Sequence, residues 1–194
     1  NRPPQPSRLS PWLGRVKKGN PRVGHIYGLG VAGYWGSTIE IETAAFPART
    51  QGKGTIRFND TAGSMAKDSV STAAAVVRLV TGKDLSDYDL HVNIVGGGNI
   101  DGPSAGAAIT CAIVSAVEKI PLRQDLAVTG EISLSGDVKP VGGVMEKAFG
   151  ARQAGMKGIL IPAENKADID AKTIGIEVIP VTHIRDVLDT MLVK

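Results

Sequence analysis

Alternation of apolar and polar positions in the first half of the chain predicts β-structure. Residues 39–43 alternate β-branched side chains with glutamates, the pattern of a half-buried strand. A glycine-containing turn at 52–54 precedes a second β-forming segment at 55–58. The glycine-rich segment 28–33 has the letters of a dinucleotide-binding loop, but no helical pattern follows it. We therefore interpret it as part of a β-hairpin or meander.

From residue 64 onward, helical and strand patterns follow one another. Apolar residues at helical spacing predict four helices, at 64–81, at 104–118, from Pro140–Gly143 to about Ala154, and at 184–192. Short apolar or alternating runs predict four strands, at 90–94, 126–134, 158–162 and 176–179. This mixture of elements predicts an α/β or α+β domain.

Composition divides the 194 residues into an arm and a domain. Prolines and basic residues mark 1–21 as an extended linker, and we assign 22–194 to a single domain. Residues 1–39 hold six of the 22 basic residues and none of the 19 acidic ones, so the net charge of +3 belongs to the arm. A solvated linker explains this arm better than a nucleic-acid contact does.

Composition also limits the chemistry and the location. Cys111 is the only cysteine, which excludes an internal disulfide and a cysteine-based zinc site, and we predict no metal. The sequence contains no apolar run of membrane-spanning length and no visible signal peptide, so we expect a cytoplasmic protein without a membrane partner.

The candidate chemistry centres on Ser104, which lies in a glycine-rich stretch, 96–106, directly before an apolar helical run. We expect Ser104 in the first turn of that helix, where free backbone N–H groups and the helix dipole stabilise a developing oxyanion. A serine that only caps the helix has the same pattern. A catalytic Ser104 needs a base to accept its proton, and the sequence offers two.

His183 is the first candidate base. Gly102-Pro103-Ser104-Ala105-Gly106 matches the Gly-x-Ser-x-Gly nucleophile elbow, and three acids precede His183 as in α/β-hydrolases: Asp137, Asp168 and Asp170. This arrangement would suit a small-ester hydrolase. A glycine loop separates Ser104 from the preceding strand, however, and His183 has the setting of a helix N-cap residue.

Lys147 is the second candidate base. At helical spacing it shares an apolar face with Val144 and Ala151. Burial of an ammonium group against such a surface favours its neutral form, and a neutral lysine is a general base in Ser-Lys enzymes. An exposed helix lysine gives the same periodicity, so the residue pattern alone does not choose between the two bases.

The segment 101–106, Asp-Gly-Pro-Ser-Ala-Gly, resembles the nucleophile motif of the Lon protease family's proteolytic domain. Residues 128–132 resemble the family's Thr-Gly-Glu strand, and 138–147 resemble its lysine motif. Lys147 follows Ser104 by 43 positions, which suits the family, and the resemblance extends from about Val23 to Leu192.

The resemblance implies an α+β fold with a mixed sheet, an N-terminal β-hairpin region and helices packed on the sheet. It implies a serine endopeptidase that cleaves unfolded or damaged proteins, assembles as a homohexamer and acts in protein quality control. The family couples this domain to an AAA+ module. This chain has no P-loop, so ATP and Mg²⁺ would be needed only if such a module is attached upstream. We expect no cofactor in the chain itself.

The resemblance also assigns roles within the site. Ser104 would be the nucleophile and Lys147 the base, with Thr129 orienting the lysine and Glu131 in the same supporting strand. Backbone groups of the Gly102-Pro103-Ser104-Ala105 loop would hold the oxyanion, although Pro103 has no N–H to donate. Asp101 would order the loop or pair with Lys147. Two alternatives are a Ser104/His183 esterase and a non-catalytic Lon-like ring or DNA-associated module.

Overall fold

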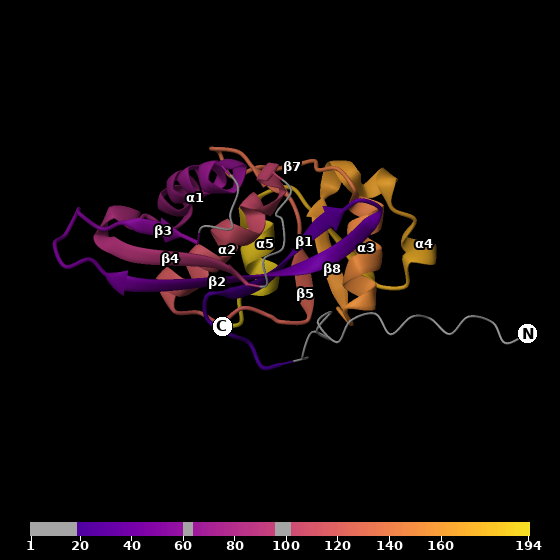
Figure 1. The fold of residues 1–194 in the computed structure, drawn as a ribbon, viewed down its shortest axis with the longest axis horizontal. Helices are drawn as coiled ribbons and strands as arrows, with labels where there is room; N and C mark the ends of the chain where they lie inside the picture. Colours follow the sequence, from indigo (N-terminus) through magenta and orange to yellow (C-terminus); the bar gives the residue numbers. More distant parts are fainter. Residues whose placement is uncertain (1–18, 60–63, 96–101) are drawn as a thin grey trace, which may run out of the picture.

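A seven-stranded mixed sheet forms the centre of the computed structural model, which describes residues 19–59, 64–95 and 102–194 (Figure 1). Its strand order is β3-β4-β2-β1-β5-β8-β9. The β1–β2 and β2–β4 pairs are antiparallel, and the other neighbouring pairs are parallel. These strands are β1 (His25–Ala32), β2 (Trp35–Pro47), β3 (Ile56–Phe58), β4 (Tyr88–Val95), β5 (Leu126–Val128), β8 (Gly158–Pro162) and β9 (Glu177–Val181). The mixed sheet confirms the α+β prediction.

β1 and β2 form the predicted glycine-rich hairpin. Ala32 pairs with Trp35, which leaves Gly33 and Tyr34 as a two-residue turn. Gly33 has a φ of +64°, a conformation that suits glycine at the first central position of a hairpin turn. The hairpin, rather than a nucleotide-binding loop, explains the glycines in this segment.

Helices cover both faces of the sheet. One buried cluster unites α1 (Ser64–Thr81), α2 (Gly106–Glu118) and α5 (Ile184–Met191) with one face. The other unites α3 (Val144–Gln153) and α4 (Ala171–Ile174) with the opposite face, and Figure 1 shows these two helices far from α1. Successive strand side chains point to opposite faces, so Ile26 joins the first cluster and Tyr27 the second. None of the described helices is long and apolar enough to cross a bilayer.

Two helix starts differ from the prediction. Ser104 lies in a short 3₁₀ turn, η2 (Gly102–Ala105), and α2 begins at Gly106. The reason is that the Ser104 carbonyl accepts a hydrogen bond from the Gly130 N–H at 2.9 Å. The helix expected from Pro140 begins at Val144, because Gly143 has a left-handed φ of +65° and serves as the N-cap.

The predicted strand at 126–134 is divided. β5 ends at Val128, and the chain continues into β6 (Glu131–Ile132), which pairs with β7 (Val138–Lys139) in a separate two-stranded sheet. The break lies at Gly130, whose N–H donates to Ser104 and whose carbonyl accepts from the Ala107 N–H at 3.0 Å. These bonds draw the chain away from the central sheet.

The remaining short elements are η1 (Leu85–Asp87) and η3 (Ala163–Asp168). Of the linker predicted at 1–21, residues 1–18 lie outside the described part of the chain. Arg22 and Leu122 exchange two backbone hydrogen bonds, of 3.0 and 2.8 Å, which attach the start of the predicted domain to the segment before β5.

Candidate active site

The carboxyl end of β5 connects elements from both faces of the sheet. Thr129 donates its backbone N–H to the Leu160 carbonyl of β8 at 3.1 Å, so it still follows the sheet. Its neighbour Gly130 is bonded instead to the Ser104 turn and to the first turn of α2. The backbone of Ser104 is therefore anchored directly beside Thr129.

Lys147 reaches the same point from the opposite face. It lies on α3 with only 2% of its surface exposed, which makes it one of the largest fully buried side chains among the described residues. Its Nζ donates to the Oγ1 of Thr129, itself fully buried, at 3.3 Å. Consecutive residues, Thr129 and Gly130, thus connect Lys147 on one side and Ser104 on the other.

Two glycines set how closely α3 approaches the sheet. A Cβ on Gly36 of β2 would lie 1.8 Å from the Glu146 carbonyl oxygen and 2.8 Å from the Lys147 Cα. A Cβ on Gly150 of α3 would lie 2.3 Å from the Gly36 carbonyl. This contact fixes the depth of the Lys147 backbone. Sequence reasoning missed it, although a glycine inside a helical pattern is a signal of close packing.

A cavity of about 250 Å³ opens beside the Ser104 turn. Its lining residues are Asp68, Ser69, Thr72, Pro103, Glu131 and Ile132. Ser104 itself is 7% exposed, and Ala105 is buried. Glu131, predicted as a supporting residue, contributes to this cavity and is exposed. Asp101 lies outside the described residues, so its predicted role stays a prediction.

Below the Ser104 turn, α2 is almost entirely buried, and its core includes Cys111. Burial raises the pKa of the Cys111 thiol, so the thiol stays protonated at neutral pH. Thr110 donates its hydroxyl to the Gly106 carbonyl at 2.7 Å. The helix behind Ser104 is therefore a rigid apolar support and offers no reactive nucleophile of its own.

His183 has a structural role at the start of α5. It is the N-cap of α5: its Nδ1 accepts from the Arg185 N–H at 3.2 Å, and its Nε2 contacts the Ser135 carbonyl at 2.9 Å. Both ring nitrogens are therefore engaged. These contacts agree with the N-cap interpretation of His183. They also argue against His183 as the base for Ser104, because both of its nitrogens already have partners.

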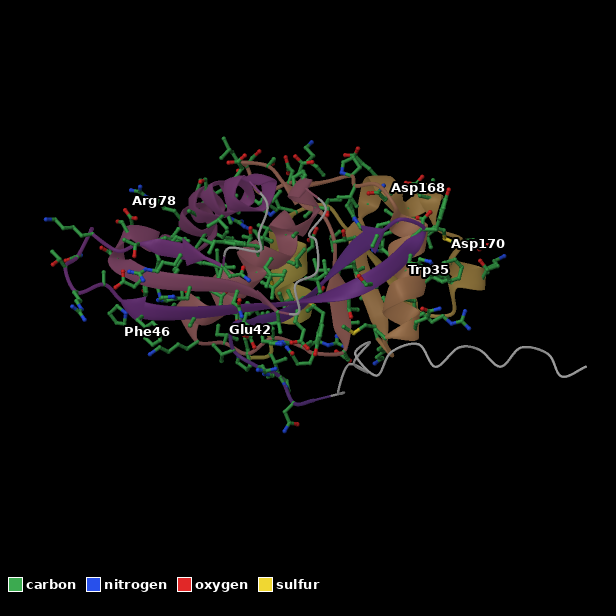
Figure 2. The ribbon with its side chains drawn as sticks, in the orientation of Figure 1. Trp35, Glu42, Phe46, Arg78, Asp168 and Asp170 are labelled. Atoms are coloured by element: carbon green, nitrogen blue, oxygen red, sulfur yellow. The ribbon has the colours of Figure 1, made fainter. Side chains whose placement is uncertain are left out.

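The acids proposed for a triad with His183 also have other partners. Asp168 accepts from the Asn165 side-chain amide at 2.8 Å, and Asp170 caps α4. Figure 2 shows both at the outer edge of the molecule, beside α4. The backbone of Asp137 pairs with that of His183. The carboxylate of Asp137, however, accepts from the Ser135 hydroxyl at 3.5 Å, so the backbone pairing does not by itself join the two side chains.

The sequence matches the family model described as the Lon protease C-terminal proteolytic domain over residues 13–194. The chain belongs to this family. Lon protease 2 of Bacillus subtilis is 44% identical over 189 residues, which cover 90% of this chain and 34% of the relative. The archaeal Lon protease of Thermoplasma volcanium is 40% identical over 183 residues, covering 89% of this chain and 28% of the relative.

This Lon proteolytic domain thus spans about a third or less of the length of the relatives that it matches. Family membership confirms the resemblance on which the fold prediction rested. Within the domain, the site residues named by that resemblance occupy the end of β5 and the elements bonded to it, with Asp101 outside the described part. Gly36 and Gly150 are structural residues that the sequence interpretation left out, and Gly130 entered it only as a letter of the Thr-Gly-Glu motif.

Proposed function

We propose that this domain is a serine endopeptidase in which Ser104 is the nucleophile and Lys147 the general base. One observation carries the proposal: a lysine buried to 98% donates to Thr129, and the adjacent residue, Gly130, binds the backbone of Ser104. A fully buried lysine is costly for stability, so its burial against the residue next to Gly130 supports the proposal of a chemical role.

Burial and Thr129 together suit Lys147 to act as a base. Removal of water disfavours the ammonium form, and the proposed base is the neutral amine, which has one lone pair and two N–H groups. One N–H is given to Thr129, which fixes the direction of the amine. The lone pair is then the group that accepts the Ser104 proton.

In the proposed reaction, the Ser104 Oγ attacks the scissile carbonyl carbon while its proton moves to the Lys147 Nζ. Backbone N–H groups at and near Ser104 stabilise the oxyanion. When the tetrahedral intermediate collapses, the C–N bond breaks and the Lys147 ammonium protonates the leaving amine. A water molecule then gives a proton to Lys147 and attacks the acyl carbon. The C–O bond to the Ser104 Oγ breaks, the Lys147 ammonium returns the proton to that oxygen, and a carboxylic acid is released.

The proposal extends to the whole protein on the strength of the family resemblance. The substrates would be unfolded or damaged proteins, the assembly a homohexamer, and the setting protein quality control in the cytoplasm. Any dependence on ATP and Mg²⁺ would come from an AAA+ module outside this chain, and the proteolytic domain itself would need no cofactor. The cavity beside Pro103 would receive a substrate side chain next to the scissile bond.

Hydrolysis of unfolded, fluorescently labelled casein tests the proposal. Ser104→Ala and Lys147→Met should each reduce turnover to background, because each removes one member of the dyad. His183→Ala should remain active, apart from a loss of stability at the α5 N-cap. Lys172→Met is the matched control, since it removes an exposed lysine from α4. An active Lys147→Met variant, or an inactive but folded His183→Ala variant, would overturn the dyad.

A further inference from the structure

Three potential metal ligands lie together on the β1–β2 pair, at its end remote from the hairpin turn. His25 of β1 pairs with Glu42 of β2, and Glu40 pairs with Tyr27, so the side chains share one face of the sheet. One ligand atom from each of His25, Glu40 and Glu42 lies within 4.8 Å of the other two. Figure 2 shows Glu42 on β2, at the lower edge of the sheet.

His25 is the unusual member of this group, because its ring is buried without a hydrogen bond. Its residue is 2% exposed, and neither Nδ1 nor Nε2 has a hydrogen-bond partner in the described part of the chain. Nε2 points toward Glu40 and stops 3.5 Å from Oε2, beyond normal hydrogen-bond distance. A buried polar atom in this state is costly, and a ligand between the ring and the carboxylates would satisfy it.

The surrounding contacts orient the three side chains toward one another. The Tyr27 ring packs edge-on against His25 with centroids 5.2 Å apart, and its hydroxyl donates to Glu40 Oε1 at 3.4 Å. Asn93 donates its amide to Glu42 Oε2 at 3.4 Å.

Charge and access also favour a cation. Two carboxylates carry a formal charge of −2, and Arg22 Nη2, which forms an ion pair with this group in the described part of the chain, is as far as 4.0 Å from Glu42 Oε1. The glutamate side chains are 41% and 43% exposed, which leaves room for water and for entry of an ion. The buried imidazole supplies a fixed ligand on one side, and the two exposed carboxylates can adjust on the other.

We propose that His25, Glu40 and Glu42 bind a divalent transition-metal ion, for which Zn²⁺ is the natural probe. One imidazole and two carboxylates match the ligands of zinc, with water in the remaining position, at about 2.0–2.2 Å. The ion would connect β1 to β2 at the end of the hairpin where the chain enters the domain. Gly36, toward the other end of β2, is four residues from Glu40 and six from Glu42, or about 13 to 20 Å at the usual strand rise. The site is therefore separate from the proposed dyad and does not depend on it.

The test is zinc uptake by the 194-residue chain after chelation and dialysis. Equilibrium dialysis with metal analysis should give about one saturable Zn²⁺ per chain, and zinc should raise Tm because the ion binds the folded state. Co²⁺ in place of Zn²⁺ should give visible absorption bands from nitrogen and oxygen ligation. Peptidase activity plays no part in these measurements, so a failed dyad would leave them unaffected.

Two variants and one control assign the site. His25→Gln should weaken zinc binding at least about tenfold and abolish the Tm increase, as expected for the loss of one ligand. Glu40→Gln should do the same while leaving the apo fold intact, because this side chain is partly exposed. His91→Gln removes an exposed histidine from β4 and should bind as the parent does. Unsaturable uptake, or equal affinity in the parent and Glu40→Gln, would refute the site.

Discussion

Replacing Thr129 with valine removes the hydroxyl that positions the Lys147 amine and keeps nearly the same side-chain shape. Thr129 is fully buried, and valine replaces its hydroxyl by a methyl group of similar size, so the change removes a hydrogen-bonding group without opening a cavity. The Lys147 Nζ loses an acceptor that now lies at 3.3 Å. If the dyad operates as proposed, the variant should fold and should cleave substrate more slowly.

The magnitude follows from the loss of the Thr129 acceptor to a buried donor, which costs about 1–3 kcal/mol where the bond acts in the transition state. At about 1.4 kcal/mol per factor of ten, this corresponds to roughly a 5- to 150-fold loss in rate. The 3.3 Å distance is at the long end for an N–H···O bond, so the lower half of that range applies, near tenfold. The loss should fall on kcat, with KM nearly unchanged, because Thr129 orients the base and does not line the cavity.

The assay is steady-state cleavage of an unstructured fluorogenic peptide across a range of pH. Thr129→Ser is the matched control: it keeps the hydroxyl, and its kcat should stay within about threefold of the parent despite some loss of stability from the missing methyl group. Thr129→Val should also shift the limb of the pH–rate profile that reports the base. A valine variant with the parent's kcat and pH profile would refute the positioning argument.

Three further predictions concern the support of the site. Gly36→Ala should lower the free energy of unfolding by about 1–3 kcal/mol and lower kcat at least tenfold, because its Cβ would collide with the Glu146 carbonyl and displace α3. The control Gly142→Ala has open space around the new Cβ, so thermal unfolding and turnover should stay nearly unchanged. Cys111 should resist alkylation until the domain unfolds, because it is fully buried and the pKa of its thiol is raised. Mass spectrometry measures the alkylation, and rapid labelling of the native protein would contradict this prediction. Hydrogen bonds from Thr182 and from the α5 N-cap, His183, lower the pKa of Asp186. Asp186→Asn should therefore lower the free energy of unfolding by about 1 kcal/mol at neutral pH. That contribution is present above the unfolded-state pKa of an aspartate and is lost as pH falls through the lower folded-state value. In urea unfolding, the difference in free energy of unfolding between the parent and Asp186→Asn should therefore disappear in acid. A difference that does not change with pH would refute this assignment.

The sequence predicts those parts of the fold that depend on local patterns. The periodicity of 64–81 and 184–192 predicts α1 and α5 almost residue for residue, and the alternation at 39–43 identifies part of β2. The errors at the starts of α2 and α3 and in the division of 126–134 have a common cause. In each case, a tertiary hydrogen bond or a left-handed glycine overrides the local preference, and neither is encoded by the spacing of apolar residues.

The choice of base shows the same limit. Lys147 has the periodicity of any lysine beside an apolar stripe, and His183 has the letters of a triad member in the expected chain order. Only the packing separates them, because it buries Lys147 against Thr129 and engages both nitrogens of His183 with Arg185 and Ser135. From sequence alone the family motifs could indicate the lysine, whereas the physical reason for it lies in contacts between distant segments.

Strand alternation explains how the proposed reactants come together from opposite faces of the sheet. Along β5, Leu126 and Val128 point toward the α2 side, and Ala127 points toward the α3 side. The period of two places the next side chain, Thr129, on the α3 side, where Lys147 reaches it. Gly130 has no side chain and presents its backbone to the Ser104 turn; a Cβ there would lie 2.6 Å from Val138. A shift of one residue in this strand would turn the threonine toward α2 and leave Lys147 without its acceptor, so the register of β5 is as much a part of the proposed site as the serine and the lysine.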